Sequence, residues 1–376
     1  MKTRILPWAV LAIAGLAACS ESGDRYYRPI DKADYPAADG PGEKLADNEV
    51  ESAARISAII EARLRNLYPT GTIRRDAHPK ADGCVKAVFT VLPGLAPPLD
   101  AGLFRRPGSY DAVIRFSNAN EDPHRADKEA DGRGMAIKVF DPPGTPLTVD
   151  PQGRPSQDFI MISHPTFLVS DPGDYRKLIG YVDSEDKLTQ LFQPVLAFLS
   201  IGLTGTRNAV ATTSLRIDNP LHTRYWSMVP YQLGASAVKF SAEPCAAAPA
   251  GPPPDDGDPD FLRHALAASL RPGSPGACMA FKIQPRTSDA LSVEDSRFEW
   301  PEDQAPFHQV ATITIPAQAF DDPEQNRACE HMSYSPWHAL PEQKPLGAVN
   351  RMRKVIYERI SAIRRESETA PPPNRQ

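Results

Sequence analysis

The residues best suited to unusual chemistry lie near the carboxyl end, between Gly347 and Glu366. This stretch contains no Pro, and apolar residues recur at positions 349, 352, 356, 360 and 363, which predicts a helix with one buried face. Arg353, Tyr357 and Arg364 fall on or beside that face, at offsets of four and seven. Because buried guanidinium and phenol groups are costly without partners, we expect an anionic or metallic group to meet them. The alternative is a basic amphipathic helix whose arginines reach outward to water.

Arg353 and Tyr357 are one helical turn apart, so the guanidinium of one can reach the phenol of the other. A free tyrosine has a pKa of about 10, and a phenolate at neutral pH therefore needs strong stabilisation. A neighbouring guanidinium together with a ferric ion would provide it.

The composition and the periodicity of the rest of the chain predict the elements that position this helix. Pro accounts for 40 of the 376 residues, about twice the average usage of roughly 5%, which argues against a helical bundle. Helical periodicity is present at 47–67 and at 174–203, where Leu188, Leu191, Phe192, Val195 and Leu199 share one side. Short runs of strand type, which together predict an antiparallel sheet or barrel, occur at 84–91, 112–117, 135–140, 159–162, 212–217, 225–229, 237–240, 279–283 and 310–315.

The amino-terminal segment predicts export. Lys2 and Arg4 precede an apolar run that ends Leu16-Ala17-Ala18-Cys19, which resembles a bacterial lipobox. We expect 1–18 to be a signal peptide, and Cys19 to carry a lipid that anchors a periplasmic lipoprotein to the membrane, by analogy the outer membrane because Ser20 follows it. The alternative is an ordinary signal in which Cys19 is incidental. Residues 19–46 are predicted to form a flexible tether, 47–366 the folded domain and 367–376 a disordered tail.

The cysteine spacing argues against a zinc site, and the net charge argues against nucleic-acid binding. Cys84, Cys245, Cys278 and Cys329 lack the spacing of a zinc site. In an oxidising periplasm they can form disulfides, and Cys245 with Cys278 would close the loop between them, but the sequence leaves the pairing open. A net charge of −5 without long basic runs gives no basis for nucleic-acid binding.

Five motifs in consistent order, between about residue 70 and residue 366, resemble the catalase family, and in particular its small bacterial haem proteins that consist of the core barrel alone. The motifs are Arg75-Asp76-Ala77-His78-Pro79-Lys80-Ala81, Val113-Ile114-Arg115-Phe116-Ser117, Asp131-Gly132-Arg133-Gly134-Met135-Ala136-Ile137-Lys138, Ser335-Pro336-Trp337-His338-Ala339-Leu340-Pro341 with Lys344-Pro345-Leu346-Gly347, and Asn350-Arg351-Met352-Arg353-Lys354-Val355-Ile356-Tyr357. The resemblance implies an α+β fold, an eight-stranded antiparallel β-barrel with flanking helices. It also implies a ferric haem b cofactor. Monomer or dimer is expected, because the chain lacks most of the arm through which large catalases tetramerise.

The resemblance also implies roles for individual residues. Tyr357 would be the iron ligand, held as a phenolate by Arg353. His78 would be the distal acid–base, oriented by Ser117. Three arginines would bind the haem propionates and two phenylalanines would help to wall the pocket, namely Arg75, Arg115 and Arg364, and Phe116 and Phe167.

One position departs from the family pattern. Ser163 falls where the family has a distal Asn, and Leu168 replaces an aromatic residue of many relatives. A hydroxyl is shorter than an amide and lacks its fixed geometry, so we expect weaker positioning of hydrogen peroxide and a roomier distal side. The sequence therefore favours an oxidoreductase that reduces hydrogen peroxide or organic peroxides with an electron donor it does not identify. The alternatives are an enzyme that metabolises lipid hydroperoxides and a haem-binding barrel without activity.

Overall fold

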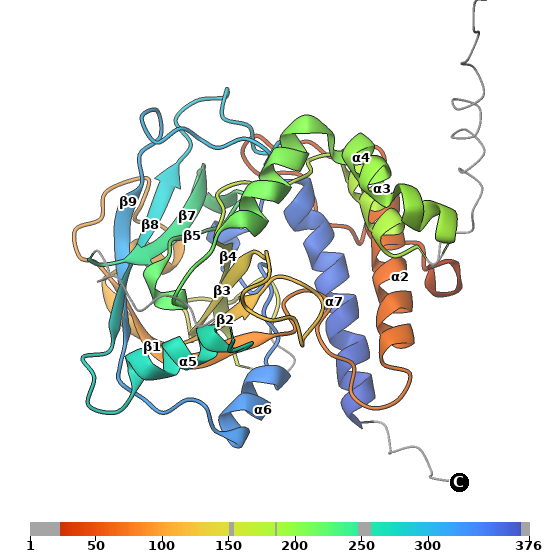
Figure 1. Cartoon of the computed structure of the whole chain (residues 1–376). Helices are drawn as coiled ribbons and strands as arrows, with labels where there is room; N and C mark the ends of the chain where they lie inside the picture. Colours follow the sequence, from red (N-terminus) through yellow and green to blue (C-terminus); the bar gives the residue numbers. More distant parts are fainter. Residues whose placement is uncertain (1–22, 150–153, 185, 247–256, 370–376) are drawn as a thin grey trace, which may run out of the picture.

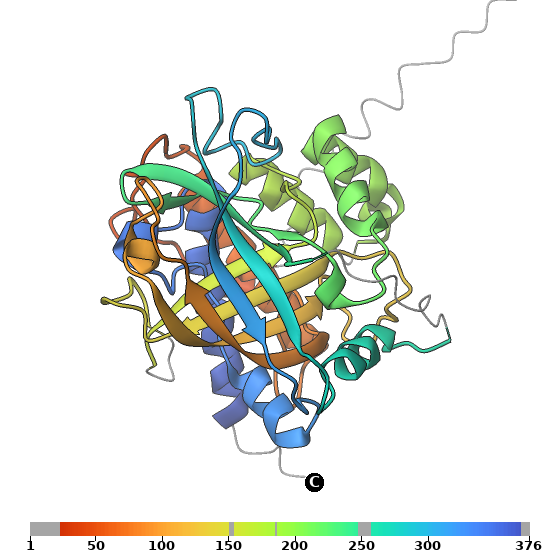
Figure 2. The same ribbon diagram turned by 90° about the vertical axis from the view of Figure 1, so that its left-hand side faces the viewer.

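The computed structural model describes residues 23–149, 154–184, 186–246 and 257–369, and the predicted signal peptide (1–18) and the predicted lipid-anchor residue Cys19 lie outside them. At its centre is a closed antiparallel β-barrel (Figures 1 and 2). Eight strands form the ring in the order β1-β2-β3-β4-β5-β7-β8-β9, and β6 pairs only with β7. The expectation of an eight-stranded antiparallel barrel with flanking helices is confirmed. The strands are β1 (Ala81–Val91), β2 (Gly108–Asn118), β3 (Arg133–Phe140), β4 (Ser156–Ile162), β5 (Tyr225–Trp226), β6 (Tyr231–Leu233), β7 (Ser236–Pro244), β8 (Ala277–Pro285) and β9 (His308–Ile315).

The barrel closes because alternate side chains of each strand fill its interior. Phe89, Phe159 and Phe281 meet there, with ring centroids 4.7 to 5.8 Å apart. Offset and edge-on aromatic contacts at these distances add to the free energy of burial. Side chains on the opposite faces of β2 and β3 point out of the barrel, toward the helices.

The helices lie outside the barrel, most of them together on one side of it (Figure 1). They are α2 (Glu49–Leu67), α3 (Pro172–Val182), α4 (Lys187–Ser214), α5 (Phe261–Leu270), α6 (Pro323–His331) and α7 (Ala348–Thr369), with short 3-10 turns η2 (Asp24–Tyr26), η3 (Gly102–Arg105), η4 (Pro220–His222) and η5 (Pro341–Gln343). The apolar stripe predicted for the last helix is buried at all five positions, and with α2 it forms a second apolar core. Tyr357 therefore stands on a helix whose rotation is fixed by packing.

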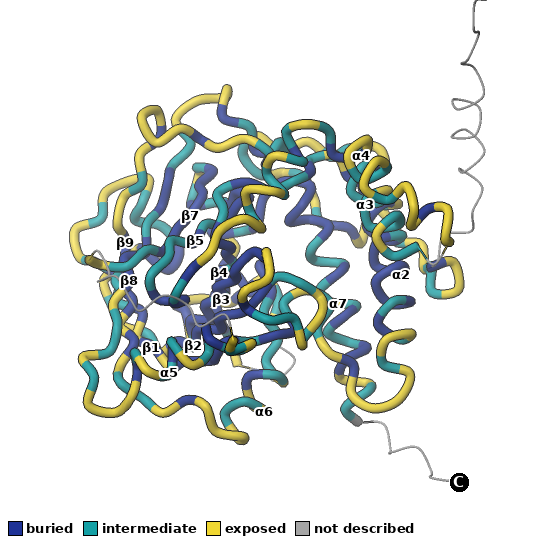
Figure 3. The backbone as a smooth tube through the Cα atoms, in the orientation of Figure 1, coloured by how far each residue is buried: buried dark blue, intermediate teal, exposed yellow. Residues whose placement is uncertain are grey.

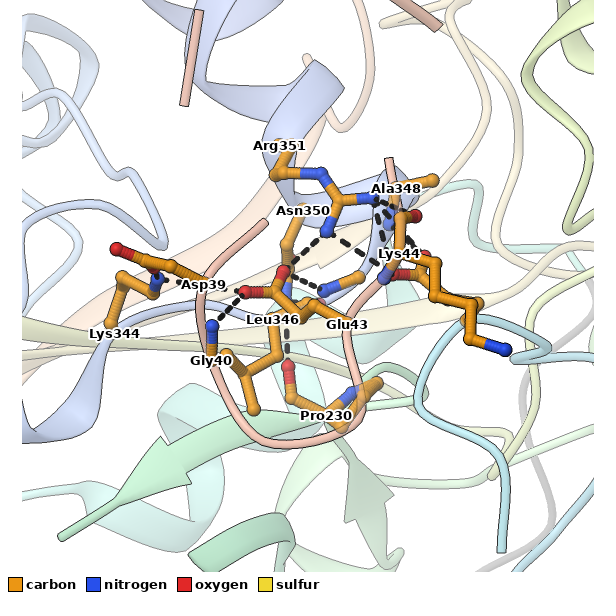
Figure 4. A network of polar contacts seen from close by, with 12 residues as sticks. Asp39, Gly40, Glu43, Lys44, Pro230, Lys344, Leu346, Ala348, Asn350 and Arg351 are labelled. Carbon is orange, nitrogen blue, oxygen red and sulfur yellow. Dashed lines mark hydrogen bonds and ion pairs between the residues drawn. The ribbon is translucent and has the colours of Figure 1, made fainter. Parts of the chain in front are cut away.

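A buried ionic network ties the start of α7 to the amino-terminal segment (Figure 4). The guanidinium of Arg351 donates to Glu43 and, at 2.7 Å, to Glu49. Glu43 also accepts from the backbone N–H of Gly347 at 2.8 Å, and Glu294 accepts from that of Ala348 at 2.7 Å. Carboxylates at a helix amino terminus satisfy free N–H groups and complement the helix dipole.

Three segments differ from the sequence predictions. Of the segment expected to be a tether, the described residues from 23 to 46 pack on the domain, because Tyr35 and Glu43 are drawn into contacts with α2 and α7. The predicted strand at 212–217 is wrong, because α4 continues to Ser214 and the Thr212 hydroxyl donates to the Asn208 carbonyl inside the helix at 2.7 Å. Helix α7 also runs to Thr369, into the expected tail.

Two disulfides resolve the cysteine pairing. Cys84 of β1 pairs with Cys329 of α6, 245 residues away, and Cys245 pairs with Cys278. The first bond holds α6 against the barrel at the edge of the cavity described next.

Candidate haem site

A cavity of about 140 Å³ lies between the outer face of β2, β3 and β4 and the inner face of α7. His78 and Tyr357 both line it, His78 from the barrel side and Tyr357 from α7. The other lining residues are Arg75, Asp76, Ala77, Arg115, Ser117, Gly134, Met135, Ala136, Ile160, Met161, Ser333, Tyr334, Ile356, Ile360, Ser361 and Arg364. Six of the residues predicted from the sequence to form the site therefore meet at one cavity.

Successive side chains of a strand point to opposite faces, so only some of the residues predicted on β2 reach the cavity. Arg115 and Ser117 of β2 line it, whereas Phe116, which lies between them, points into the barrel, where its ring centroid is 6.0 Å from that of Tyr225. The structure thus places Phe116 in the barrel core and not on the pocket wall. The period of two in strands could have predicted this from the sequence.

His78 is held by its backbone and by its neighbours. Its φ is 61°, an uncommon value for a residue with a side chain. Its Nδ1 lies 3.0 Å from the Ser117 hydroxyl. A Cβ at Gly134 would lie 2.6 Å from the His78 ring, so only glycine leaves room for the imidazole in this position.

The electrostatic surroundings keep His78 neutral. Burial lowers the pKa of His78 to about 3, and the positive charges of Arg115 and Arg353 add to the shift. The imidazole therefore stays uncharged throughout the neutral range and can accept a proton.

Three arginines crowd one edge of the cavity. Arg75 donates to the Glu330 carboxylate at 2.6 Å, Arg115 approaches it at 3.4 Å, and Arg364 donates to the Glu330 carbonyl. Burial lowers the pKa of Arg75 to about 9, and Arg115 contributes to this shift. Among the described residues, the Nε atoms of Arg115 and Arg364 are buried without a hydrogen-bond partner. Two guanidiniums thus share one carboxylate and the third contacts the backbone of the same residue, so the cluster can bind further anionic oxygens.

Arg353 shares one turn of α7 with Tyr357 but is not among the cavity-lining residues. Its guanidinium carbon lies 5.8 Å from the centre of the Phe167 ring, and its Nη1 is 3.4 Å from the Asn350 side-chain oxygen. Phe167 likewise lies off the cavity lining and packs edge-on against Tyr175, with centroids 5.7 Å apart. The pair thus forms part of the layer behind the cavity.

Ser163 also lies away from the cavity lining. Its hydroxyl accepts from the Arg133 backbone N–H at 3.0 Å, and its own N–H donates to the Arg133 carbonyl at 2.8 Å. The serine thus extends the pairing of β4 with β3 by one residue. Its hydroxyl is occupied by the backbone.

A buried network that the sequence did not predict lies behind the cavity. Asp158 accepts from Lys138 at 2.9 Å and contacts His338 Nδ1 at 2.8 Å. Burial raises the pKa of Asp158, but Lys138 and His338 outweigh it, so the pKa lies below its usual value. Lys138 Nζ lies 5.2 Å from the ring centre of Tyr334, a cavity-lining residue. Lys138 and His338 stand in motifs that the resemblance singled out, but their pairing through Asp158 has no signal in the linear order.

The cavity residues fit a haem on the observations above. Unpartnered guanidinium nitrogens suit propionates, apolar Ile356, Ile360 and Met161 suit a porphyrin face, and a tyrosine oxygen is a known iron ligand. Among the described residues, no group of three or more His, Cys, Asp and Glu side chains could hold a metal ion.

Comparison with known proteins identifies the architecture. No family model matches the sequence, and no curated protein matches it. Among solved structures, a fungal catalase matches with a TM-score of 0.59 at 15% identity, over 91% of this chain and 68% of that one. Catalase A from Saccharomyces cerevisiae matches with a TM-score of 0.59 at 17% identity, over 89% and 71% of the two chains. A bacterial catalase gives 0.57 at 16% identity, over 96% and 72%. The fold of this chain is therefore that of the catalases.

Proposed function

We propose that this protein is a haem-dependent peroxidase or catalase-like enzyme that reduces hydrogen peroxide or organic peroxides. The observation that carries the proposal is the cavity itself, where a tyrosine on a packed helix and a neutral, half-buried histidine share one space with three arginines. A barrel needs none of these residues for its own packing, and the catalase-like fold supports the same interpretation.

Haem b would be held by Tyr357 at the iron and by Arg75, Arg115 and Arg364 at the propionates. The Glu330 side chain is 43% exposed, so it can turn toward solvent when other anions reach the arginines. Bound there, haem would supply the redox chemistry that the reduction of a peroxide requires.

The protein itself provides proton transfer. Neutral His78 accepts the proton from one peroxide oxygen at Nε2 and returns it to the other, which assists heterolysis of the O–O bond. Ser117 at Nδ1 holds the ring in one orientation during both transfers. The positive charges of Arg115 and Arg353 disfavour the imidazolium and so favour the return of the proton.

Lipid hydroperoxides are a second candidate substrate, favoured by one feature of the surface. Helix α4 exposes Leu191, Leu199 and Leu203, and its Asn208 amide donates to the Phe167 carbonyl at 2.9 Å, behind the cavity. An apolar surface so close to the site would suit substrates with long acyl chains.

The experiment is a comparison of oxygen release and donor oxidation by one haem-loaded sample. Hydrogen peroxide with and without a reducing dye separates peroxidation from dismutation, because only dismutation releases oxygen. A fatty-acid hydroperoxide without a donor tests the second candidate. His78→Gln is expected to keep the haem and lose about 10²–10⁴-fold in turnover, whereas the exposed His308→Gln is the control. Haem-loaded protein that consumes none of these peroxides would overturn the proposal and leave a haem-binding barrel without activity.

A further inference from the structure

We propose that the outer face of α4 is a membrane-docking surface that lies in the plane of a lipid bilayer. This outer face consists of Leu188, Leu191, Phe192, Val195, Phe198, Leu199 and Leu203, all of them exposed (Figure 3). The inference concerns the surface alone and does not depend on haem or on peroxide chemistry.

Helix α4 is amphipathic, but its apolar stripe faces solvent and not the protein core. Thr189, Ser200, Ile201 and Gly205 are buried against the protein, while leucines and phenylalanines at helical spacing face outward. Leu191, Leu199 and Leu203 are 71%, 64% and 69% exposed. A helix on a protein in water normally places its apolar stripe on the core. The reversal indicates that a second apolar medium covers this stripe.

The distribution of charge favours lipid as that medium. No Asp, Glu, Lys or Arg occurs from Leu188 to Thr206, and Lys187 and Arg207 stand at the two ends. Basic side chains that flank an apolar helix can extend to the phosphate layer while the stripe enters the acyl region.

Contacts at both ends keep α4 on the protein surface. Asp183, in the turn that precedes α4, accepts from Arg63 of α2 at 2.7 Å. Near the other end, Gly205 packs against the Leu168 carbonyl, and Asn208 donates to the carbonyls of Phe167 and Arg297 at 2.9 Å. By length and hydropathy alone α4 could cross a membrane, but the non-helical Gly202 interrupts it and these contacts hold it along the domain.

The first described residues lie on the same side of the molecule as α4. Gly23 packs on the backbone of Ala58 and Ile59 in α2, and Gly180 of α3 lies over the Ile59 side chain. Figure 1 shows the amino-terminal turn beside the α3–α4 hairpin. Cys19 precedes Gly23 by four residues, a span of at most about 14 Å. A lipid on Cys19 would therefore hold the domain where the outer face of α4 meets the membrane.

The test measures how deeply a position on the protein enters the bilayer of vesicles made of phosphatidylethanolamine and phosphatidylglycerol. The acyl chains of these lipids are brominated, and bromine quenches tryptophan fluorescence. The full-length protein is reconstituted with Leu199→Trp, and the added fluorescence is compared with that of Leu67→Trp, an equally simple change at an exposed leucine on α2. We expect bromine quenching at least fivefold stronger at position 199. Leu191→Asp with Leu203→Asp should abolish that difference, whereas Leu147→Asp should not, all with unchanged circular dichroism.

Three results would overturn the proposal. Equal quenching at 199 and 67 would mean that the anchor alone holds the protein. Cross-linking between copies through position 199, with no quenching, would make the face a dimer interface. Residues 191 and 203 are about 18 Å apart along the helix, so very different bromine depths for Leu191→Trp and Leu203→Trp would indicate a spanning helix.

Discussion

Glycine at position 134 illustrates how single residues set the chemistry of the cavity. A Cβ here would collide with the His78 ring and would lie 2.8 Å from the Ser117 hydroxyl, so the imidazole can occupy its position only because residue 134 has no side chain. His78 in turn depends on a left-handed backbone conformation. Position and protonation state of the acid–base are thus both fixed by its neighbours.

We expect Gly134→Ala to displace the imidazole by a few tenths of an ångström or more and to lower turnover at least tenfold. Haem binding should persist, because Tyr357 and the three arginines are untouched. Gly108→Ala, at the opposite end of β2 from Ser117 and with only ordinary contacts for an added Cβ, controls for general effects. Steady-state assays at matched haem content compare the turnover of both variants with that of the wild type. Unchanged turnover in Gly134→Ala would contradict the assigned position of His78.

The pH profile follows from the neutral state of His78. Because its pKa lies at about 3 in the fold, acid should not protonate it between about pH 8 and pH 5, where an ordinary histidine titrates. We expect no loss of turnover centred near pH 6.5 in kcat/KM measurements. In the unfolded chain His78 regains its usual pKa and binds a proton first, so this residue lowers the free energy of unfolding as pH falls from about 6.5 toward 3. An acid limb centred near 6.5 that disappears in His78→Gln would contradict the assignment.

At the scale of elements, α7 carries the site, and the buried network around Arg351 orients it. Arg351 is completely buried, and it neutralises Glu43 and Glu49, which also lie in the interior. Since Arg351 lies two residues before Arg353, the contacts that fix the start of α7 also fix the turn that bears Arg353 and Tyr357. The segment from 39 to 49 therefore supports the helix that lines the cavity.

Arg351→Met should lower the free energy of unfolding by about 3–5 kcal/mol, because it leaves buried carboxylates without a cation. Lys354→Met, which removes an exposed pair with Glu358 on the same helix, should cost about 0–1 kcal/mol. Chemical denaturation monitored by circular dichroism measures both. Equal stabilities of the two variants would show that the network contributes nothing to the fold.

The elements also show what sequence could and could not predict. The apolar stripe of α7 could be predicted because apolar side chains at helical spacing normally pack into the core, as they do in this helix. The stripe of α4 has the same spacing, but most of its buried positions are small or polar, and spacing alone does not tell which side faces the protein. Strand β6 and helices α5 and α6 were not predicted from the sequence. They are short, and their formation depends on contacts with distant parts of the chain. The position of Ser163 depends on where β4 ends, which no local pattern gives.

At the scale of the whole molecule, the barrel and its helical layer are joined by bonds between distant parts of the chain. Cys84–Cys329 spans 245 residues and fixes α6 beside Arg75, whereas Cys245–Cys278 spans 33. The chain covers about seven-tenths of the length of the catalases whose fold it shares.

Replacing Cys84 and Cys329 by Ser should destabilise the fold more than the same change at Cys245 and Cys278. In the chain-entropy model, the longer loop gives about 2 kcal/mol of additional stabilisation. Unfolding midpoints of the two double variants in guanidinium chloride provide the comparison. A smaller effect for the Cys84–Cys329 pair would mean that α6 is held chiefly by other contacts.

The absorption spectrum of haem-reconstituted protein, compared between Tyr357→Phe and Tyr334→Phe, tests the central claim most directly. Both tyrosines line the cavity, and each substitution removes one hydroxyl. We predict that the wild type and Tyr334→Phe show the Soret band of a high-spin ferric haem, and that Tyr357→Phe loses it at least tenfold at equal protein concentration. Failure of the wild type to bind haem, or a band unchanged in Tyr357→Phe, would contradict the account.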